Sequence, residues 1–186
     1  RFFGLPPYQI PFAKSPFAGQ SINCRTCHMV DEHLDQKELG MRAYSDFASR
    51  TPVPRREDNQ TTVVRNTPNL VDASLDRENF LLHFDGEFSS LSQLIIDTLA
   101  GRNFGWLPAE KQLAIAHVCQ IIKEDNGSGE LASEFGGISY TEMFSGVTHA
   151  GDKVAEKYLL PDKFRINIEQ APCEAIYSSV VMLIAA

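Results

Sequence analysis

The residues with the clearest chemical signature lie together in the run Cys24-Arg25-Thr26-Cys27-His28. Two thiols three positions apart, followed at once by an imidazole, form the C-x-x-C-H pattern by which c-type haem is attached. In this arrangement the thiols of Cys24 and Cys27 reach two vinyl groups at one edge of the macrocycle, and His28 ligates the iron from the proximal side. The spacing therefore predicts one covalent haem c.

Two other uses of a C-x-x-C pair fit the sequence less well. A zinc site needs a second pair of ligands at suitable spacing, and Cys119 and Cys173 are isolated. A thioredoxin-like dithiol follows a buried strand in a βαβ pattern, but no such pattern surrounds this motif. Haem attachment remains the prediction for this pair.

The other two cysteines lie on apolar helical stripes and are predicted to face the core. Cys119 shares its stripe with Ile115 and Val118, and Cys173 shares one with Ile176 and Tyr177. Two inert buried thiols and one disulfide between packed helices are both compatible with these stripes.

Composition limits the remaining classes of protein. The chain has 186 residues, of which 43% are hydrophobic and 22% charged, and its net charge is −7. This composition is that of a globular domain. An acidic balance without a run of Lys and Arg argues against nucleic acid and against an anionic membrane surface as partners. No apolar stretch reaches the ~18 residues of a spanning helix, so no membrane span is expected.

The elements that must position the motif are helices and long loops. We expect an all-α fold, because no segment alternates cleanly enough to predict a strand. A structureless loop is expected from Ser49 to Pro68, and loops of this length often serve a ligand. Helices are expected over 24–33, between Ser90 and Gly101, from 108 to about 125, over 140–144 and 152–158, and over 171–186.

Three further segments resemble one known family. The run from Phe17 to His28, the run from Arg65 to Ala73 and the block Phe84-Asp85-Gly86 before a Leu-rich helix resemble the bacterial di-haem cytochrome c peroxidases. They also resemble the related MauG-like enzymes that mature methylamine dehydrogenase. The segment from Cys173 to Ala186 is similar to the helix that closes the N-terminal haem domain of this family.

This resemblance implies an architecture and a function. Residues 1–186 would form a single c-type haem domain, a cytochrome c-like helical fold with long loops wrapped around one covalent haem. It would be the N-terminal half of a longer di-haem protein, in which this haem reacts with peroxide. The chain begins Arg1-Phe2 without Met, so we expect a mature chain without its signal peptide or a part of something longer.

The sequence departs from the family where peroxide chemistry takes place. Gln93 approximately matches a family Gln, although a capping box with Ser90 explains it as well. The family's proton-transferring Glu falls near Asn103, whose amide cannot accept a proton at neutral pH. Gln93 and Asn103 are thus the catalytic candidates. The departure leaves open a haem oxidoreductase of peroxidase type, or an electron-transfer cytochrome domain without peroxidase activity.

The sixth iron position has several candidate ligands. Met41 could supply a thioether and His83 an imidazole, and an open or water-occupied position is the third interpretation. His33 follows the proximal ligand too closely to reach the opposite haem face. His117 lies opposite an apolar stripe and is expected in solvent, and His149 is a weak candidate in a Gly-rich loop.

Further expectations concern calcium, compartment and partners. In the family the residue matching Asn66 helps to bind calcium between the two haem domains, although an Asn in a turn explains it too. Bacteria attach haem c outside the cytoplasmic membrane, so we expect a periplasmic or otherwise exported protein. The predicted partner is a second haem domain or a small redox protein. A third and weaker hypothesis is a structural or sensory haem module whose charged loop, Arg55–Asn59, docks a partner.

Overall fold

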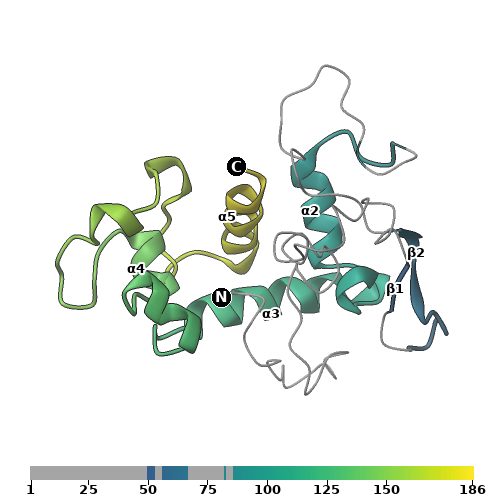
Figure 1. Ribbon diagram of the computed structural model, residues 1–186, viewed down its shortest axis with the longest axis horizontal. Helices are drawn as coiled ribbons and strands as arrows, with labels where there is room; N and C mark the ends of the chain where they lie inside the picture. Colours follow the sequence, from purple (N-terminus) through teal and green to yellow (C-terminus); the bar gives the residue numbers. More distant parts are fainter. Residues whose placement is uncertain (1–49, 53–55, 67–81, 83–85) are drawn as a thin grey trace, which may run out of the picture.

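The computed structural model describes residues 50–52, 56–66, 82 and 86–186. Most of the regular structure of these residues is helical, which agrees with the predicted class (Figure 1). Within these ranges no helix is long and apolar enough to cross a membrane. The longer elements are β1 (Arg50–Pro52), β2 (Thr62–Asn66), α2 (Leu91–Leu99), α3 (Lys111–Glu124), α4 (Tyr140–Ser145) and α5 (Cys173–Ala185). Short 3-10 helices connect them: η4 (Arg102–Phe104), η5 (Pro108–Glu110), η6 (Glu130–Phe135), η7 (Glu156–Tyr158) and η8 (Asp162–Phe164).

Helix α2 forms where its cap and apolar stripe predict it. The Ser90 hydroxyl accepts a hydrogen bond from the Gln93 N–H at 3.2 Å, which satisfies one of the unpaired donors of the first turn. The helix ends before Gly101, where a Cβ atom would lie 2.1 Å from the Asp97 carbonyl oxygen. Only glycine fits this close approach, and the chain turns there into η4.

Helix α3 is also confirmed, with a 3-10 turn at its start. Glu110 closes this turn by accepting a hydrogen bond from the Leu107 N–H at 2.9 Å. The helix then runs to Glu124, and most of its apolar residues are buried. These are Ala114, Ile115, Val118, Cys119, Ile121 and Ile122.

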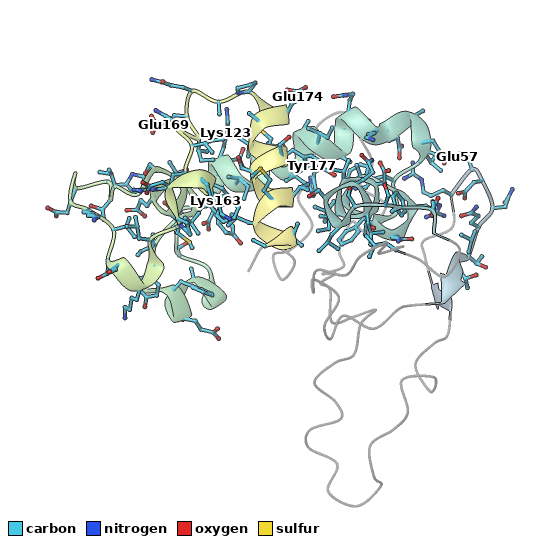
Figure 2. The ribbon with its side chains drawn as sticks, turned by 90° about the horizontal axis from the view of Figure 1, so that it is seen from above. Glu57, Lys123, Lys163, Glu169, Glu174 and Tyr177 are labelled. Atoms are coloured by element: carbon cyan, nitrogen blue, oxygen red, sulfur yellow. A yellow bond between two sulfur atoms is a disulfide. The ribbon has the colours of Figure 1, made fainter. Side chains whose placement is uncertain are left out.

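Helix α5 completes what we call the helical core, which consists of α2, α3 and α5. It packs against both other helices and lies between α2 and the α4 region (Figure 1). Tyr177 points from α5 toward α2 (Figure 2), and its hydroxyl donates to the Ile96 carbonyl oxygen at 2.6 Å. Burial of the phenol raises the pKa of Tyr177 above its ordinary value, so the hydroxyl remains a donor.

Residues 125–172 form what we call the capped segment, because polar side chains hold its short helices to their loops. Ser139 caps α4 by accepting from the Glu142 N–H at 3.2 Å, and the Glu142 carboxylate accepts from the Ser139 N–H at 2.8 Å. Helix α4 confirms the helix expected over 140–144. Of the helix expected over 152–158, only the 3-10 turn η7 forms.

The expectation of a structureless loop from Ser49 to Pro68 is wrong in part. β1 and β2 pair antiparallel within it, with Arg50 opposite Asn66 and Pro52 opposite Thr62. The β-branched residues of the run Thr61-Thr62-Val63-Val64 favour an extended backbone. This pair of strands has an irregular register. Strands of 3 and 5 residues are too short to show a clear alternating pattern in the sequence.

Candidate functional site

Most of the residues predicted to hold the haem lie outside the described ranges. Cys24, Cys27 and His28 are among them, and so are the sixth-ligand candidates Met41 and His83. The haem contacts therefore stay predictions. What the structure does describe is the surroundings of the two catalytic candidates, the two other cysteines and several charged groups.

Gln93 lies on the exposed side of α2 and is engaged along its own helix. Its side-chain amide donates to the Asp97 carboxylate at 2.8 Å, and Lys111 donates to the same carboxylate at 3.0 Å. Partial burial raises the pKa of Asp97, but these two hydrogen bonds outweigh it and hold the pKa below its ordinary value. Only the Ser90 half of the predicted capping box forms, since the Gln93 side chain turns to Asp97 instead.

Asn103 lies in η4 and is also exposed. Its neighbour Phe104 is partly buried against the helical core, and Trp106 is buried within that core. Neither Asn103 nor Gln93 lines the pocket found in the described part of the chain.

Two ion pairs attach the segment 56–60 to the turns on either side of Trp106. Arg56 donates to Glu110 at 2.6 Å and to the Gly105 carbonyl oxygen at 3.2 Å. Arg102 donates to both carboxylate oxygens of Asp58, at 2.6 and 3.2 Å. The hydrogen bond from Arg102 lowers the pKa of Asp58, and the hydrogen bond to Glu110 raises the pKa of Arg56.

These pairs bear on the hypothesis that the charged loop Arg55–Asn59 docks a partner. The side chains of Arg56 and Asp58 are both occupied by intramolecular ion pairs. Glu57 also pairs with Arg56, at 3.3 Å, but its side chain is 76% exposed. Among the described charges of this loop, those of Arg56 and Asp58 hold it to η5 and η4.

Asn66 is the last residue of β2, so its backbone belongs to a strand rather than to the predicted turn. It stands opposite Arg50 in the ribbon. Calcium binding by Asn66 stays a prediction, because the structure does not describe the position of its side chain.

The two remaining cysteines are joined. A disulfide links Cys119 of α3 to Cys173 of α5, with their Cα atoms 5.2 Å apart. This distance lies within the usual range for a disulfide, and Cys119 is only 2% exposed. Of the two alternatives left open by the sequence, the structure shows the disulfide.

His117 is not in solvent, contrary to the expectation from the helical stripe. Its ring lies 5.7 Å from the ring of Trp106 and is half-buried. Burial disfavours the charged imidazole and lowers the pKa of His117. The error arises because Trp106, which lies between η4 and η5, packs beside the face of α3 that carries His117. Periodicity within one helix does not reveal what packs on its polar face.

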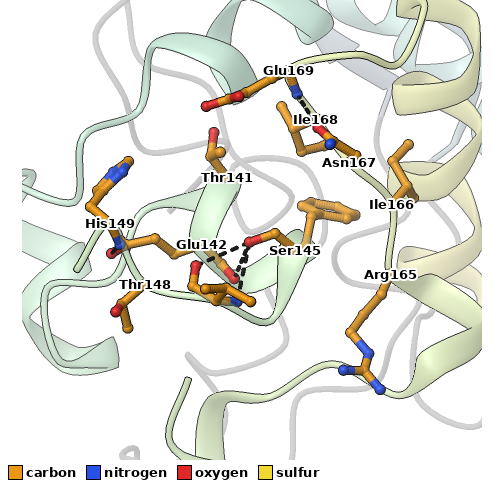
Figure 3. A pocket seen from close by; sticks show the side chains of 12 residues that line it. Thr141, Glu142, Ser145, Thr148, His149, Arg165, Ile166, Asn167, Ile168 and Glu169 are labelled. Carbon is orange, nitrogen blue, oxygen red and sulfur yellow. Dashed lines mark hydrogen bonds between the residues drawn. The ribbon is translucent and has the colours of Figure 1, made fainter. Parts of the chain in front are cut away.

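A pocket of about 520 Å³ opens in the capped segment. Glu142, Thr148 and His149 lie on one side of it, and the chain from Arg165 to Asn167 lies on the other (Figure 3). The Glu142 carboxylate is already occupied, because it accepts from the Ser139 N–H and hydroxyl and from the His149 N–H at 2.9 Å.

This pocket is the part of the structure that sequence reasoning missed, apart from His149. The spacing Ser139-x-x-Glu142 is a capping-box signal and could have placed Glu142 at a helix start. No sequence signal places the chain around Arg165 opposite it. Among the residues that the structure describes, no group of three or more His, Cys, Asp or Glu side chains could hold a metal ion.

Comparison with known proteins adds no relative. No family model, no curated protein and no solved structure matches the chain. The case for a function therefore comes from the residues of the chain themselves.

Proposed function

We propose that the chain is a c-type haem domain that carries out redox chemistry with peroxide or with a partner haem. The observation that carries this proposal is the motif Cys24-Arg25-Thr26-Cys27-His28. Cys24 and Cys27 would form the two thioether bonds, and the imidazole of His28 would ligate the iron. The bound haem would supply a one-electron couple between ferric and ferrous iron.

The disulfide of the helical core supports this use of the motif. The chain has four cysteines, and the structure joins two of them, Cys119 and Cys173. These two sulfurs are therefore not thiolates that could complete a zinc site with Cys24 and Cys27. A buried disulfide also fits an oxidising compartment, which is where the proposed export would bring the chain.

The residues Cys24, Cys27 and His28 fit haem c, and this fit is read from the sequence alone. Two thiols for the two vinyl groups and one imidazole for the iron, in this order, are the protein groups that covalent haem attachment requires. The remainder of the proposed architecture is the family's: a helical domain wrapped around the haem, with a second haem domain or a small redox protein as electron partner. Calcium at Asn66 belongs to the same proposal.

A second candidate function is electron transfer without peroxide turnover. Cleavage of an O–O bond needs a distal group that can move a proton between the two oxygens. Asn103 carries an exposed amide, and the Gln93 amide is engaged by Asp97. Both observations favour the electron-transfer function, because neither side chain is a buried proton-transferring group.

Peroxide kinetics separate the two functions. If the family's alignment holds at position 103, the wild type should react slowly with hydrogen peroxide, as followed by haem absorption in stopped-flow mixing. Asn103→Glu should accelerate this step, since general acid–base assistance is typically worth about 10²–10⁴ in rate. Asn126→Glu is the matched control, because Asn126 is also exposed but lies in the turn after α3.

Each result of this experiment selects one function. Acceleration by Asn103→Glu alone supports peroxidase-type chemistry at an open iron position. Equal, slow rates in all three proteins mean either that position 103 is not distal or that the sixth position is filled. Slow binding of carbon monoxide to the ferrous form would show a firmly held sixth ligand such as Met41 or His83 and would support electron transfer, whereas fast binding would show that position 103 is not distal. A fast wild type would show that a group other than Asn103 moves the proton.

A further inference from the structure

Four cysteines can pair in three ways. One pairing joins Cys119 to Cys173 and keeps Cys24 with Cys27. Each of the other two connects the C-x-x-C-H motif to the helical core through two disulfides. Both of these pair each sulfur of the motif with a cysteine far away in the sequence, whereas the first pairing leaves the two motif sulfurs with each other.

The fold of the helical core selects the first pairing. Packing of α3 against α5 brings the Cα atoms of Cys119 and Cys173 to 5.2 Å. Cys119 is buried in a stripe that includes Val118 and Ile122, both also buried. The pair is thus brought together by apolar packing across 54 positions of sequence and needs no residue of the haem motif.

We propose that the Cys119–Cys173 disulfide partitions the thiols of this chain, so that Cys24 and Cys27 remain available for haem. This inference rests on the proposed function. It assigns the disulfide a role in maturation, in addition to any stability that it gives to the folded protein.

The chemistry that the disulfide prevents is thiol–disulfide exchange. In an oxidising compartment, a protein disulfide oxidant can convert Cys24 and Cys27 to a local disulfide, itself taking up the two electrons. A protein dithiol reductant can return the two thiols that haem attachment needs, itself becoming a disulfide. If Cys173 is unpaired, its thiolate can attack the sulfur of Cys24, forming a new disulfide and releasing Cys27 as a thiolate. One S–S bond forms and one breaks, so the exchange needs no further oxidant.

The two core cysteines differ in how readily they would carry out this attack. Cys173 is the first residue of α5 and is partly exposed, and a helix N-terminus favours the reactive thiolate. Cys119 lies in the middle of α3 and is 2% exposed. An unpaired Cys173 should therefore trap the haem motif more efficiently than an unpaired Cys119.

The test compares single and double variants of the exported, full-length chain. Haem per chain is measured by the pyridine adduct, and disulfides are mapped by mass spectrometry of non-reduced peptides. We expect Cys119→Ala, which leaves Cys173 unpaired, to lose most of its haem and to give peptides that join Cys173 to Cys24 or Cys27. Cys173→Ala should lose less, and the double variant should keep haem close to the wild-type level.

The double variant separates partition from stability. It lacks the disulfide entirely, so if loss of stability were the cause of haem loss, it would lose at least as much haem as either single variant. Equal haem in all four proteins, or equal loss in the single and double variants, overturns the proposal. A wild type without haem would instead refute the proposed function on which the inference rests.

Discussion

In the helical core, apolar side chains from α2, α3 and α5 meet and a disulfide joins two of the helices. In the capped segment, carboxylates and hydroxyls hold short helical turns to the loops that connect them. Asp125 accepts from the Tyr140 N–H at 2.8 Å. Glu142, in α4, accepts from the Ser139 N–H before the helix and from the His149 N–H after it. Burial and a covalent bond stabilise the first region. The second region shares the apolar core through Phe144 and Ile168, and charge-assisted hydrogen bonds to the backbone hold the rest of it together.

Because different interactions stabilise them, the two regions should respond differently to reduction and to acid. Reduction acts on the helical core, because the described disulfide lies there. Acid acts on both regions, but on different groups. In the core it must charge a half-buried imidazole, and in the capped segment it must neutralise a carboxylate that accepts three hydrogen bonds.

The largest effect is expected from removal of the core disulfide. The double variant with Cys119→Ala and Cys173→Ala should lose about 4 kcal/mol of unfolding free energy, as the chain-entropy model gives for a bridge spanning 54 positions. Urea unfolding followed by far-UV circular dichroism measures this loss. Reductant should destabilise the wild type by a similar amount and leave the double variant unchanged. A double variant as stable as the wild type would show that packing alone holds α3 to α5.

A smaller effect is expected from Glu142→Gln. The substitution keeps the shape but replaces one accepting oxygen with an N–H₂ group that faces backbone donors. The expected cost is about 2 kcal/mol. It should be confined to the capped segment, which amide hydrogen exchange would show as faster exchange at Ser139 and His149 with little change in α3.

Glu134→Gln is the matched control for this variant, since Glu134 is exposed in the same segment. Faster exchange throughout α3 and α5 in Glu142→Gln would show that the effect spreads through the shared apolar core instead of staying in the capped segment. An effect of equal size in Glu134→Gln would show that the loss of negative charge, rather than of the hydrogen bonds, is responsible.

The smallest effect concerns His117 and pH. Burial lowers the pKa of His117 from 6.5, so below about pH 6.5 the unfolded chain takes up a proton that the folded chain does not. Stability should therefore fall as the pH falls from 7 through 6.5 to the lower folded value. His117→Gln should flatten this slope in urea titrations at pH 7, 6 and 5. An unchanged slope would mean that another group titrates.

The capped segment should respond to acid only at lower pH. Partial burial raises the pKa of Glu142, but the hydrogen bonds from Ser139 and from the His149 N–H outweigh it, so the pKa lies below 4.5. The stabilisation by this carboxylate is complete above pH 4.5 and is lost as the pH falls through the lower folded value. Exchange at the His149 amide, corrected for intrinsic rates, should thus stay constant between pH 7 and 5 and rise only below 4.5.

The same contrast explains how much of the fold could be predicted. Local periodicity and caps encode the helical core, so the bounds of α2, α3 and α5 followed from Ser90, Gly101, Pro108 and the stripe after Cys173. The capped segment depends on pairs such as Asp125 with Tyr140, in which a side chain reaches a backbone group fifteen positions away. A local pattern does not encode such a contact, and neither the 3-10 turns nor the pocket was predicted.

The residues of the candidate site also differ in how far the sequence alone predicts their roles. The C-x-x-C-H motif is a local signal, and it carries the proposed function without any tertiary information. Roles that depend on what packs nearby could not be read locally. The half-buried environment of His117 needed the structure. The pair of Gln93 with Asp97 has the i,i+4 spacing of a helix, which the sequence does contain.

The central claim is that Cys24, Cys27 and His28 hold one covalent haem. The most direct measurement is the absorption spectrum of the reduced pyridine adduct of the exported, denatured chain, set against the protein concentration. We predict the two-thioether spectrum at one haem per chain, and a shift to the one-thioether spectrum in Cys24→Ala. A correctly exported chain that carries no covalent haem would contradict the account.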